Sequence, residues 1–511
     1  MHMENKPVKK EVITEYGERL MQGEVRCLAW LYEELVSENS AGLSIIADYI
    51  KRFMSGLGSA QLIKLDEQFR DTSSMEWMIR WKEVDIDRFE IYIKDREAFL
   101  WVARLGTFHP NGFFREKCVR KLLRDRKSVP FLLLRLNDWV KLVRDIAGLV
   151  ANNINDLTIE ELIECLPYIH KVENCYRRDY SIIENIKKMM ASRISDQMAD
   201  FDLTKLRSYE MQARRMLYRI ILENQALDKD GIKKIIGLEK NSQLQAYITT
   251  GYMQYYNISL EELDEFENHK SEVVQRFAIE QKYKILSNVW DGLEEKLLAS
   301  SAGLRSSVKF ILQYKTDIDV KKFYMDRIDS EVKRVCILGV GENGNETDAE
   351  YLMKYLDDDD SGVVKRTLRA LGMLMGDKAA DIFWKYLHDE RKGVRGQAYR
   401  EIIAAKIRYK AEDVYNYFME TDSVHLKRKL VMIISKGQYW DRLPYILLLL
   451  SHDDETISEI ARNGLRKKSM YGKTSKENAA WIREILSDDQ YRVPENMKKS
   501  ILFDLKVTEG V

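Results

Sequence analysis

Few residues of this chain have the types and spacing that chemistry requires. The 7 histidines are scattered, and none forms the His-x-x-x-His or His-Glu-x-x-His pattern of converging zinc ligands. The acidic run 357–360 lacks the glycine and the terminal glutamate of an EF-hand calcium loop. No Gly-x-Ser-x-Gly elbow and no phosphate-loop lysine occurs. We therefore predict no metal, no cofactor and no catalytic residue, and we interpret the acidic run as a solvated turn that caps a helix.

Two further strings could carry chemistry, and each has a structural explanation. Residues 339–344 read Gly-Val-Gly-Glu-Asn-Gly, which is the spacing of a dinucleotide-binding glycine motif. That motif requires a preceding strand, whereas this string follows a predicted helix, so we reject it as a nucleotide site.

The string His109-Pro110-Asn111-Gly112 is interpreted as a tight turn in which Gly112 relieves a positive φ. A catalytic role for His109 is the minor alternative.

One spacing pattern recurs: an aspartate, four residues, an apolar residue and then a base. The aspartate is predicted to accept hydrogen bonds from backbone N–H groups at the start of the next helix. The base is predicted to bridge to the aspartate of the adjacent repeat and so to set the stacking register. The ladder residues are Asp138 and Arg144, Asp359 and Lys365, and Asp389 and Arg395, with His109 in the acidic place ahead of Arg115. Near Val332 the acidic place holds Arg327, so we expect a break there.

Repeated pairs of helices are needed to position these residues. The segment Lys354 to Asp357 realigns with Lys385 to His388, 31 positions further along. In each unit an amphipathic first helix is followed by an acidic turn, and the second helix carries apolar residues such as Leu368. Neither helix buries its apolar stripe alone, so neighbouring repeats must cover it.

Composition agrees with a helical repeat protein. The 511 residues include only 6 prolines, and the 82 basic residues balance the 82 acidic ones, which predicts no whole-protein attraction to nucleic acid or an anionic membrane. The longest apolar run, near 445–450, is far below the roughly 20 residues that span a bilayer. The 5 scattered cysteines and the polar N-terminus predict a cytoplasmic protein with reduced thiols and no secretory signal.

The chain resembles the HEAT family, in particular the short HEAT-like repeats of phycobilin-lyase relatives. The Asp-x4-Val-Arg/Lys pattern and Ala370-Leu371-Gly372 carry this resemblance, which is strongest over 270–470 and weaker over 95–150. It implies an all-α fold, an α-solenoid in the form of a right-handed superhelix of HEAT-like helix pairs with helical caps. The expected segments are an irregular helical cap at 1–95, HEAT-like repeats at 96–150, degenerate helical repeats at 151–270, a HEAT-like array at 271–472, and capping helices with a tail at 473–511.

Basic residues on predicted second helices are the best candidates for binding. In HEAT-like stacks these helices usually line the concave surface, where a basic groove could hold phosphates or an acidic protein face. The alternative is that these residues form ordinary exposed helix faces, paired to nearby acids. The candidates are Arg115, Lys117, Arg120, Lys121, Arg124, Arg214, Arg215, Arg366, Arg369 and Arg400.

The resulting functional prediction is a non-catalytic cytoplasmic scaffold or adaptor that binds another protein on a curved α-solenoid surface. The first alternative is a nucleic-acid-binding HEAT-like protein that resembles DNA alkylbase glycosylases, which hold a lesion with tryptophans and one acidic residue. Trp139, Trp290 and Trp440 do not align with that family's motif, so we carry over no catalytic residue and interpret them as packing residues. A third alternative is a modification enzyme that resembles chromophore lyases.

Overall fold

The computed structural model describes residues 10–71, 79–150, 154–175, 180–465, 473–491 and 493–509. The polar start of the chain, on which the prediction of no secretory signal rests, lies outside these residues, as do parts of the predicted terminal caps. Every regular element in the described ranges is an α-helix or a short 3-10 helix, which confirms the predicted all-α fold. The chain divides into two compact units, Met1–Ile285 and Leu286–Val511.

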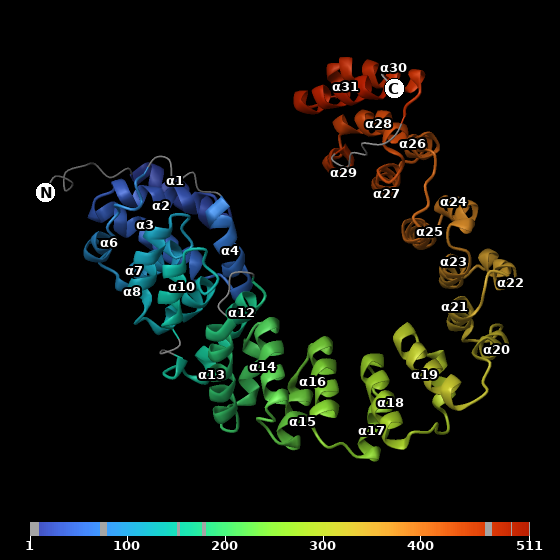
Figure 1. The fold of residues 1–511 in the computed structure, drawn as a ribbon, viewed down its shortest axis with the longest axis horizontal. Helices are drawn as coiled ribbons and strands as arrows, with labels where there is room; N and C mark the ends of the chain where they lie inside the picture. The colour runs from blue at the N-terminus through green and yellow to red at the C-terminus, as the bar shows by residue number, and fades with distance from the viewer. Residues whose placement is uncertain are drawn as a thin grey trace. The chain divides into compact units, whose positions relative to one another are not determined.

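The N-terminal unit is a stack of short helices (Figure 1). They are α1 (Lys10–Met21), α2 (Cys27–Ser37), α3 (Ser40–Met54), α4 (Ser59–Asp71), α6 (Ile86–Tyr92), α7 (Arg96–Gly106), α8 (Gly112–Leu122), η1 (Arg126–Ser128), α9 (Val129–Arg135), α10 (Lys141–Gly148), α12 (Ile159–Glu173), α13 (Tyr180–Met198), η2 (Leu203–Ser208), α14 (Met211–Glu223), α15 (Lys229–Leu238), α16 (Ser242–Tyr255), α17 (Leu260–Glu267) and α18 (Glu272–Leu286). Helix α7 packs on α8, α9 on α10, and α15 on α16, so neighbouring helices form hairpins.

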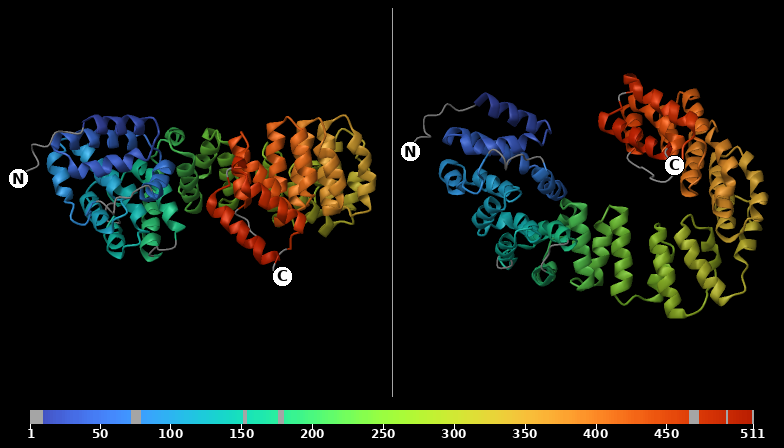
Figure 2. Two further views of the ribbon diagram at one scale, coloured as in Figure 1. Left: turned by 90° about the horizontal axis from the view of Figure 1, so that it is seen from above. Right: turned by 45° about the horizontal axis from the view of Figure 1, so that its top comes forward.

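The C-terminal unit is also built of stacked helices (Figure 2). Its elements are η3 (Leu293–Leu298), α19 (Ala302–Lys315), α20 (Val320–Met325), α21 (Lys333–Asn343), α22 (Asp348–Met353), η4 (Lys354–Asp357), α23 (Ser361–Met375), η5 (Gly376–Ala379), α24 (Ala380–Leu387), α25 (Lys392–Ala404), α26 (Ala411–Glu420), α27 (Val424–Ile434), α28 (Tyr439–Leu448), η6 (Leu449–Ser451), α29 (Glu455–Leu465), α30 (Lys476–Ser487), η7 (Asp489–Tyr491) and α31 (Glu495–Glu509). The first helices α20, α22, α24, α26 and α28 form one layer, and the second helices α21, α23, α25, α27 and α29 form another (Figure 1).

The helices begin where short polar side chains satisfy their first backbone N–H groups. Thr158 and Ser259 each form a complete capping box, with Glu161 and Glu262 in the third helical position. Behind these starts, an apolar stripe on each helix is buried by the neighbouring pair, as at Leu368 on α23. Local capping and shared burial together explain why the elements form where they do.

The glycine string at 339–344 is a packing motif. It lies in the second half of α21 and ends at its C-cap, where no strand precedes it. An added Cβ at Gly339 would lie 2.4 Å from the ring of Tyr324, and one at Gly341 would lie 2.7 Å from Cα and Cβ of Ala370 on α23. Glycine therefore allows a tyrosine ring and a neighbouring helix to approach the backbone of α21 closely.

Replacing Gly341 with valine should lower the free energy of unfolding of the C-terminal unit by about 1–3 kcal/mol, because α21 and α23 must move apart. Urea denaturation followed by far-ultraviolet circular dichroism measures this change. Gly237→Val is the matched control, since an added Cβ at Gly237 on α15 meets nothing within 4 Å. Equal stability changes in the two variants would contradict close helix packing as the role of Gly341.

Candidate functional site

The recurring aspartate pattern marks a capped turn that precedes the second helix of a repeat. The Oδ1 atom of Asp138 accepts a hydrogen bond from the N–H of Val140, 2.9 Å away. His109 acts in the same way, because its Nδ1 accepts from the N–H of Asn111 at 3.0 Å. The same hydrogen bond, to the N–H two residues further on, is made by Glu239, His269, Asp358, Asp389, Thr421 and His452. The first position of the pattern can therefore be occupied by Asp, Glu, His or Thr, because each of these side chains offers a hydrogen-bond acceptor.

The base of the pattern donates hydrogen bonds to backbone carbonyl groups of its own turn. Nη1 of Arg115 donates to the backbone oxygen of His109 at 2.7 Å. Nη1 of Arg395 donates to the backbone oxygen of Asp389 at 2.9 Å. Equivalent backward hydrogen bonds are made by Arg144, Gln275 and Arg305. The base therefore satisfies carbonyl groups that the turn leaves without helical partners.

The predicted bridge between repeats needs correction at two positions. Asp358, one residue before the predicted Asp359, occupies the capped turn, and Lys333 of the preceding second helix lies 3.3 Å from it. Asp389 pairs at 2.8 Å with Arg391 of its own turn instead of with Lys365. Four successive aspartates at 357–360 made the register ambiguous, which explains the one-residue error.

We expected the ladder to break near Val332. The structure instead shows the same turn there, with another residue type at the position of the aspartate. Ser330 takes the acidic place there, and its hydroxyl accepts from the N–H of Val332 at 3.4 Å. This longer hydrogen bond holds the turn that precedes α21, although α21 itself has no side-chain cap. The turn is therefore retained where its aspartate is lost.

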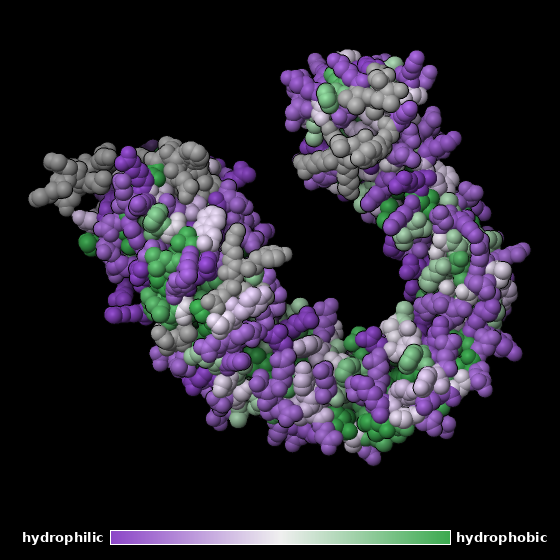
Figure 3. Space-filling view, in the orientation of Figure 1, coloured by the Kyte–Doolittle hydropathy of each residue, from purple (hydrophilic) through white to green (hydrophobic). Residues whose placement is uncertain are grey.

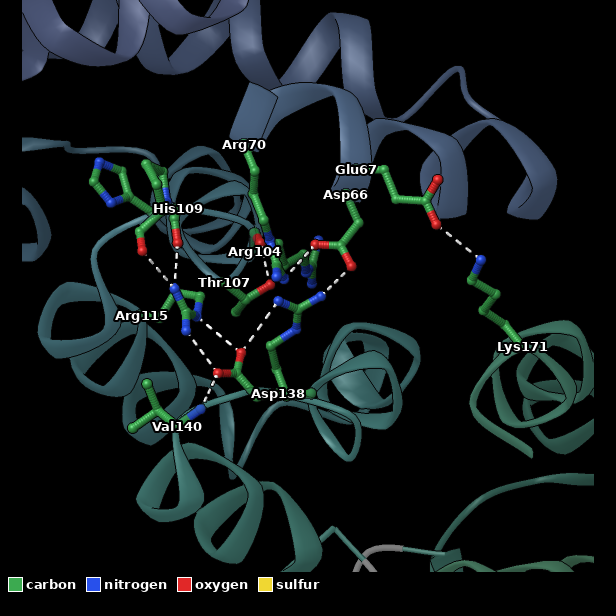
Figure 4. Close-up of polar contacts among 12 residues, drawn as sticks. Asp66, Glu67, Arg70, Arg104, Thr107, His109, Arg115, Asp138, Val140 and Lys171 are labelled. Carbon is green, nitrogen blue, oxygen red and sulfur yellow. Dashed lines mark hydrogen bonds and ion pairs between the residues drawn. The ribbon is translucent and has the colours of Figure 1, made fainter. Parts of the chain in front are cut away.

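A buried charged network surrounds the turn before α10 (Figure 4). Arg115 on α8 donates from Nε and Nη2 to both oxygens of Asp138, at 2.8 and 2.6 Å. Arg135 on α9 lies 3.5 Å from Asp138 and also pairs with Asp66 on α4. Arg115, Arg135 and Asp138 are each at most 2% exposed. Burial would raise the pKa of Asp138, but hydrogen bonds from Arg115 and the charge of Arg135 hold it below its usual value.

His109 lies beside this network as a neutral, fully buried ring. Its Nδ1 accepts a hydrogen bond, so the proton sits on Nε2, which has no hydrogen-bond partner among the described residues. The ring packs against Trp81 at a centroid distance of 4.2 Å and against Phe114 at 5.1 Å. Burial, together with the charge of Arg115, lowers its pKa to about 3. Capping and packing account for this histidine, and its burial denies a substrate access to the ring.

The binding candidates of α8 do not form a free basic groove. Arg115 belongs to the buried network, and Lys117 donates to backbone carbonyl groups. Arg120 pairs with a glutamate on its own helix, and Lys121 pairs with two carboxylates of α6. Arg124 is exposed. The acids that neutralise this helix come partly from an element that is remote in the sequence.

The two candidates on α14 are also engaged. Arg214 lies 2.8 Å from both carboxylate oxygens of Glu239, which is almost fully buried at the capped turn before α16. The guanidinium of Arg215 lies over the ring of Tyr247 at 5.4 Å from its centroid. Both arginines therefore contact the next repeat and contribute to stacking.

Arg369 makes an ion pair between repeats in the C-terminal unit. It lies 3.2 Å from Glu401 on α25, whose side chain is 3% exposed. Gly372 leaves room for this carboxylate, since an added Cβ would lie 2.5 Å from its Oε2. Burial raises the pKa of Glu401 despite the nearby charge of Arg369.

A group of cations without carboxylate partners remains on α23, α25 and α27. Lys365 and Lys429 lean from the two outer helices toward α25, where an added Cβ at Gly393 or Gly396 would lie 3.6 or 3.5 Å from their Nζ atoms. Burial lowers the pKa of Lys429, and so do the charges of Arg400 and Arg395. We call this group the basic face, and no member forms an ion pair with a described carboxylate: Lys365, Arg366, Lys392, Arg395, Arg400 and Lys429. Sequence reasoning selected Arg366 and Arg400 but missed Lys429, which no repeated pattern marks.

Apolar side chains accompany the basic face. Met373 on α23 is 38% exposed and Met432 on α27 is 42% exposed. The hydroxyl of Tyr399 on α25 lies 3.3 Å from Sδ of Met432, and Nζ of Lys429 lies 5.4 Å from the centre of the Tyr399 ring. Apolar residues are likewise interspersed among hydrophilic ones over the visible surface of this unit (Figure 3).

The N-terminal unit contains a half-open pocket of about 390 Å³ between α12, α13 and α14. Leu166, Met190 and Met216 form its apolar floor. On its rim, Lys187 pairs with Glu173 at 2.7 Å, so that charge is already compensated. Lys188, Arg219 and Glu223 also line the pocket, so its apolar volume is combined with charged side chains.

In the part of the chain that the structure describes, no group of three or more His, Cys, Asp or Glu side chains is placed to hold a metal ion. No helix in the described ranges is long and apolar enough to cross a membrane.

Stacked helix pairs with a capped turn before the second helix define an α-solenoid repeat protein. Residues 323–403, which include α21 to α24 and nearly all of α25, match the family model for HEAT repeats. This match confirms the predicted resemblance to HEAT-like repeats within the array expected at 271–472. No curated protein matches the chain. A solved structure described as an engineered protein is similar at 14% identity, with 71% of this chain and 97% of that chain covered and a TM-score of 0.25.

Proposed function

We propose that this chain is a non-catalytic cytoplasmic scaffold that binds another protein on the second-helix layer of its C-terminal unit. HEAT repeats generally serve as protein-interaction scaffolds, and the matched residues include most of the basic face. The observation that carries the proposal is the presence of exposed Met373 and Met432 beside unpaired cations on one layer of helices. Methionine and arginine are enriched in protein interfaces.

Two further observations support a protein partner in a reducing compartment. The bases on α8 and α14 that favoured nucleic acid are largely engaged within the fold, and the formal net charge is zero. The buried thiols of Cys27, Cys118, Cys165 and Cys336 are free, which fits the cytoplasm.

Photocrosslinking from the two layers of one repeat tests the proposal. Met373 on α23 and Tyr351 on α22 are matched positions, at 38% and 39% exposed, and each is replaced in turn by p-benzoylphenylalanine. Irradiation in native lysate should give an adduct of one defined mass from position 373, because that side chain lies in the proposed interface. The position on α22 should give no such adduct.

Two results would contradict the proposal. Position 373 could yield no adduct, or positions 373 and 351 could yield the same set of adducts. Release of free base from alkylated DNA by the purified chain would replace the scaffold with the glycosylase alternative. That assay is run on the unsubstituted protein, so that loss of folding cannot explain a negative result.

A further inference from the structure

We propose that the basic face binds an extended acidic segment of the partner protein, with acidic residues spaced along it. This inference rests on the proposed scaffold function and specifies the partner's chemistry. It follows from the spacing of the second helices, from the charges on the basic face and from the apolar side chains beside them.

The spacing comes from the packing of α23 on α25. Packed helices lie about 8–10 Å apart, and an extended chain rises about 3.3 Å per residue. Three residues of an extended peptide therefore span the step from α23 to α25, so acidic residues at positions i and i+3 would face these two helices. The Tyr399–Met432 contact joins α25 to α27, where a further acidic residue would meet Lys429.

The charges supply a cation on each of these helices. Arg366 lies on α23, Arg400 on α25 and Lys429 on α27, and the charge of Arg400 acts on Lys429. Three nearby carboxylates form their ion pairs with other bases: Asp360 with Arg334, Asp389 with Arg391 and Glu401 with Arg369. An incoming carboxylate could pair with cations that form no ion pair within the fold, and arginine can bind it through two parallel hydrogen bonds.

The apolar side chains indicate a peptide rather than a bare polyanion. Met373, Met432 and the partly buried ring of Tyr399 flank the cations, and flexible methionines adapt to varied apolar partners. Binding to nucleic acid draws most of its affinity from basic residues that neutralise backbone phosphates. Here Arg395 already donates to turn carbonyl groups, and the remaining cations span only three helices. The geometry favours a short acidic segment with apolar residues between its carboxylates.

Fluorescence anisotropy with a labelled nine-residue peptide tests this inference on the full chain. The peptide carries Glu at positions 2, 5 and 8 and Leu at positions 4 and 7. Two matched peptides replace each Glu by Gln, or group the three Glu residues together. We expect the Gln peptide to bind at least tenfold more weakly and the grouped peptide to bind measurably more weakly than the spaced one.

Charge variants locate the binding surface. The triple variant Arg366→Gln, Arg400→Gln and Lys429→Gln should weaken binding of the spaced peptide at least tenfold. The control variant Lys354→Gln, Lys385→Gln and Lys410→Gln removes three exposed cations associated with the first helices and should bind like the unsubstituted chain. Circular dichroism verifies that both variants retain the helical fold.

The inference is overturned if the Gln peptide binds equally well, if both triple variants lose binding equally, or if neither loses it. It is also overturned if a single-stranded oligonucleotide binds the basic face more tightly than the spaced peptide at the same salt concentration. An adduct from position 373 without binding of the acidic peptide would sink this inference and leave the scaffold function standing. Absence of both would sink the two together.

Discussion

Replacing Asp138 with alanine should lower the free energy of unfolding of the N-terminal unit by about 3–5 kcal/mol. Its carboxylate is buried and accepts from Arg115, with Arg135 at 3.5 Å. Removing it leaves the Arg115 guanidinium in the core without its carboxylate, while Asp66 continues to pair with Arg135. The capping bond to the N–H of Val140 is lost as well. Urea denaturation, fitted with one transition for each unit, measures the change.

Asp389→Ala is the matched control, because it removes the same cap in the C-terminal unit without stranding a buried charge. Its partner Arg391 is 35% exposed and returns to water, so we expect a loss of about 0.5–2 kcal/mol. Equal losses at Asp138 and Asp389 would show that capping alone determines the cost. A variant with Asp138→Leu, Arg115→Met and Arg135→Met should recover part of the lost stability, because it leaves no arginine unpaired in the core. Recovery should be incomplete, since the carbonyl groups of His109 and Pro110 lose their donor and Asp66 loses Arg135.

The fold could be predicted because its information is local and repeated. The apolar positions Val364, Leu368 and Leu371 follow helical spacing, and all three are buried on α23. The turn that precedes them carries a side-chain acceptor, which occurs again in later repeats. Each helix pair leaves an apolar face that only a neighbour can bury, so a stack follows from the pattern itself.

The binding surface could not be predicted in the same way, because the charge on a face depends on which carboxylates the fold brings near it. Lys121 appeared unpaired in sequence, yet Glu90 lies 31 residues away in the chain and 2.6 Å away in space. Arg115 resembled a groove residue but is fully buried against Asp138. No repeated sequence pattern marks Lys429, whose Nζ lies close to Gly396 on α25 only in the folded chain.

Acidification should destabilise the N-terminal unit through His109, starting near pH 6.5. The pKa of His109 is lowered from 6.5 to about 3 in the folded protein, first by burial and then by the charge of Arg115. The folded state therefore binds the proton more weakly than the unfolded state does. The stability linked to this neutral ring is fully present above pH 6.5 and is lost as the pH falls toward 3. Between pH 7.5 and pH 4.5 this contribution should fall by about 2–3 kcal/mol.

His109→Asn isolates this contribution, because an asparagine oxygen can still accept from the N–H of Asn111 but does not titrate. The variant should be less stable at pH 7.5, since it loses the packing of the imidazole against Trp81. Its stability should nevertheless change less between pH 7.5 and pH 4.5 than that of the unsubstituted chain. Carboxylates and other histidines titrate equally in both proteins, so the difference between the two slopes belongs to His109.

If the His109→Asn variant loses less stability on acidification than the unsubstituted chain, His109 holds the turn as a neutral hydrogen-bond acceptor. Protonation of Nδ1 would remove the acceptor that caps the turn and would place a second positive charge beside Arg115. An aspartate in the same place, such as Asp138, instead gains from nearby arginine and stays ionised at lower pH. The histidine turn should therefore fail at a higher pH than the aspartate turn beside it. Identical pH dependence in the His109→Asn variant would contradict this role.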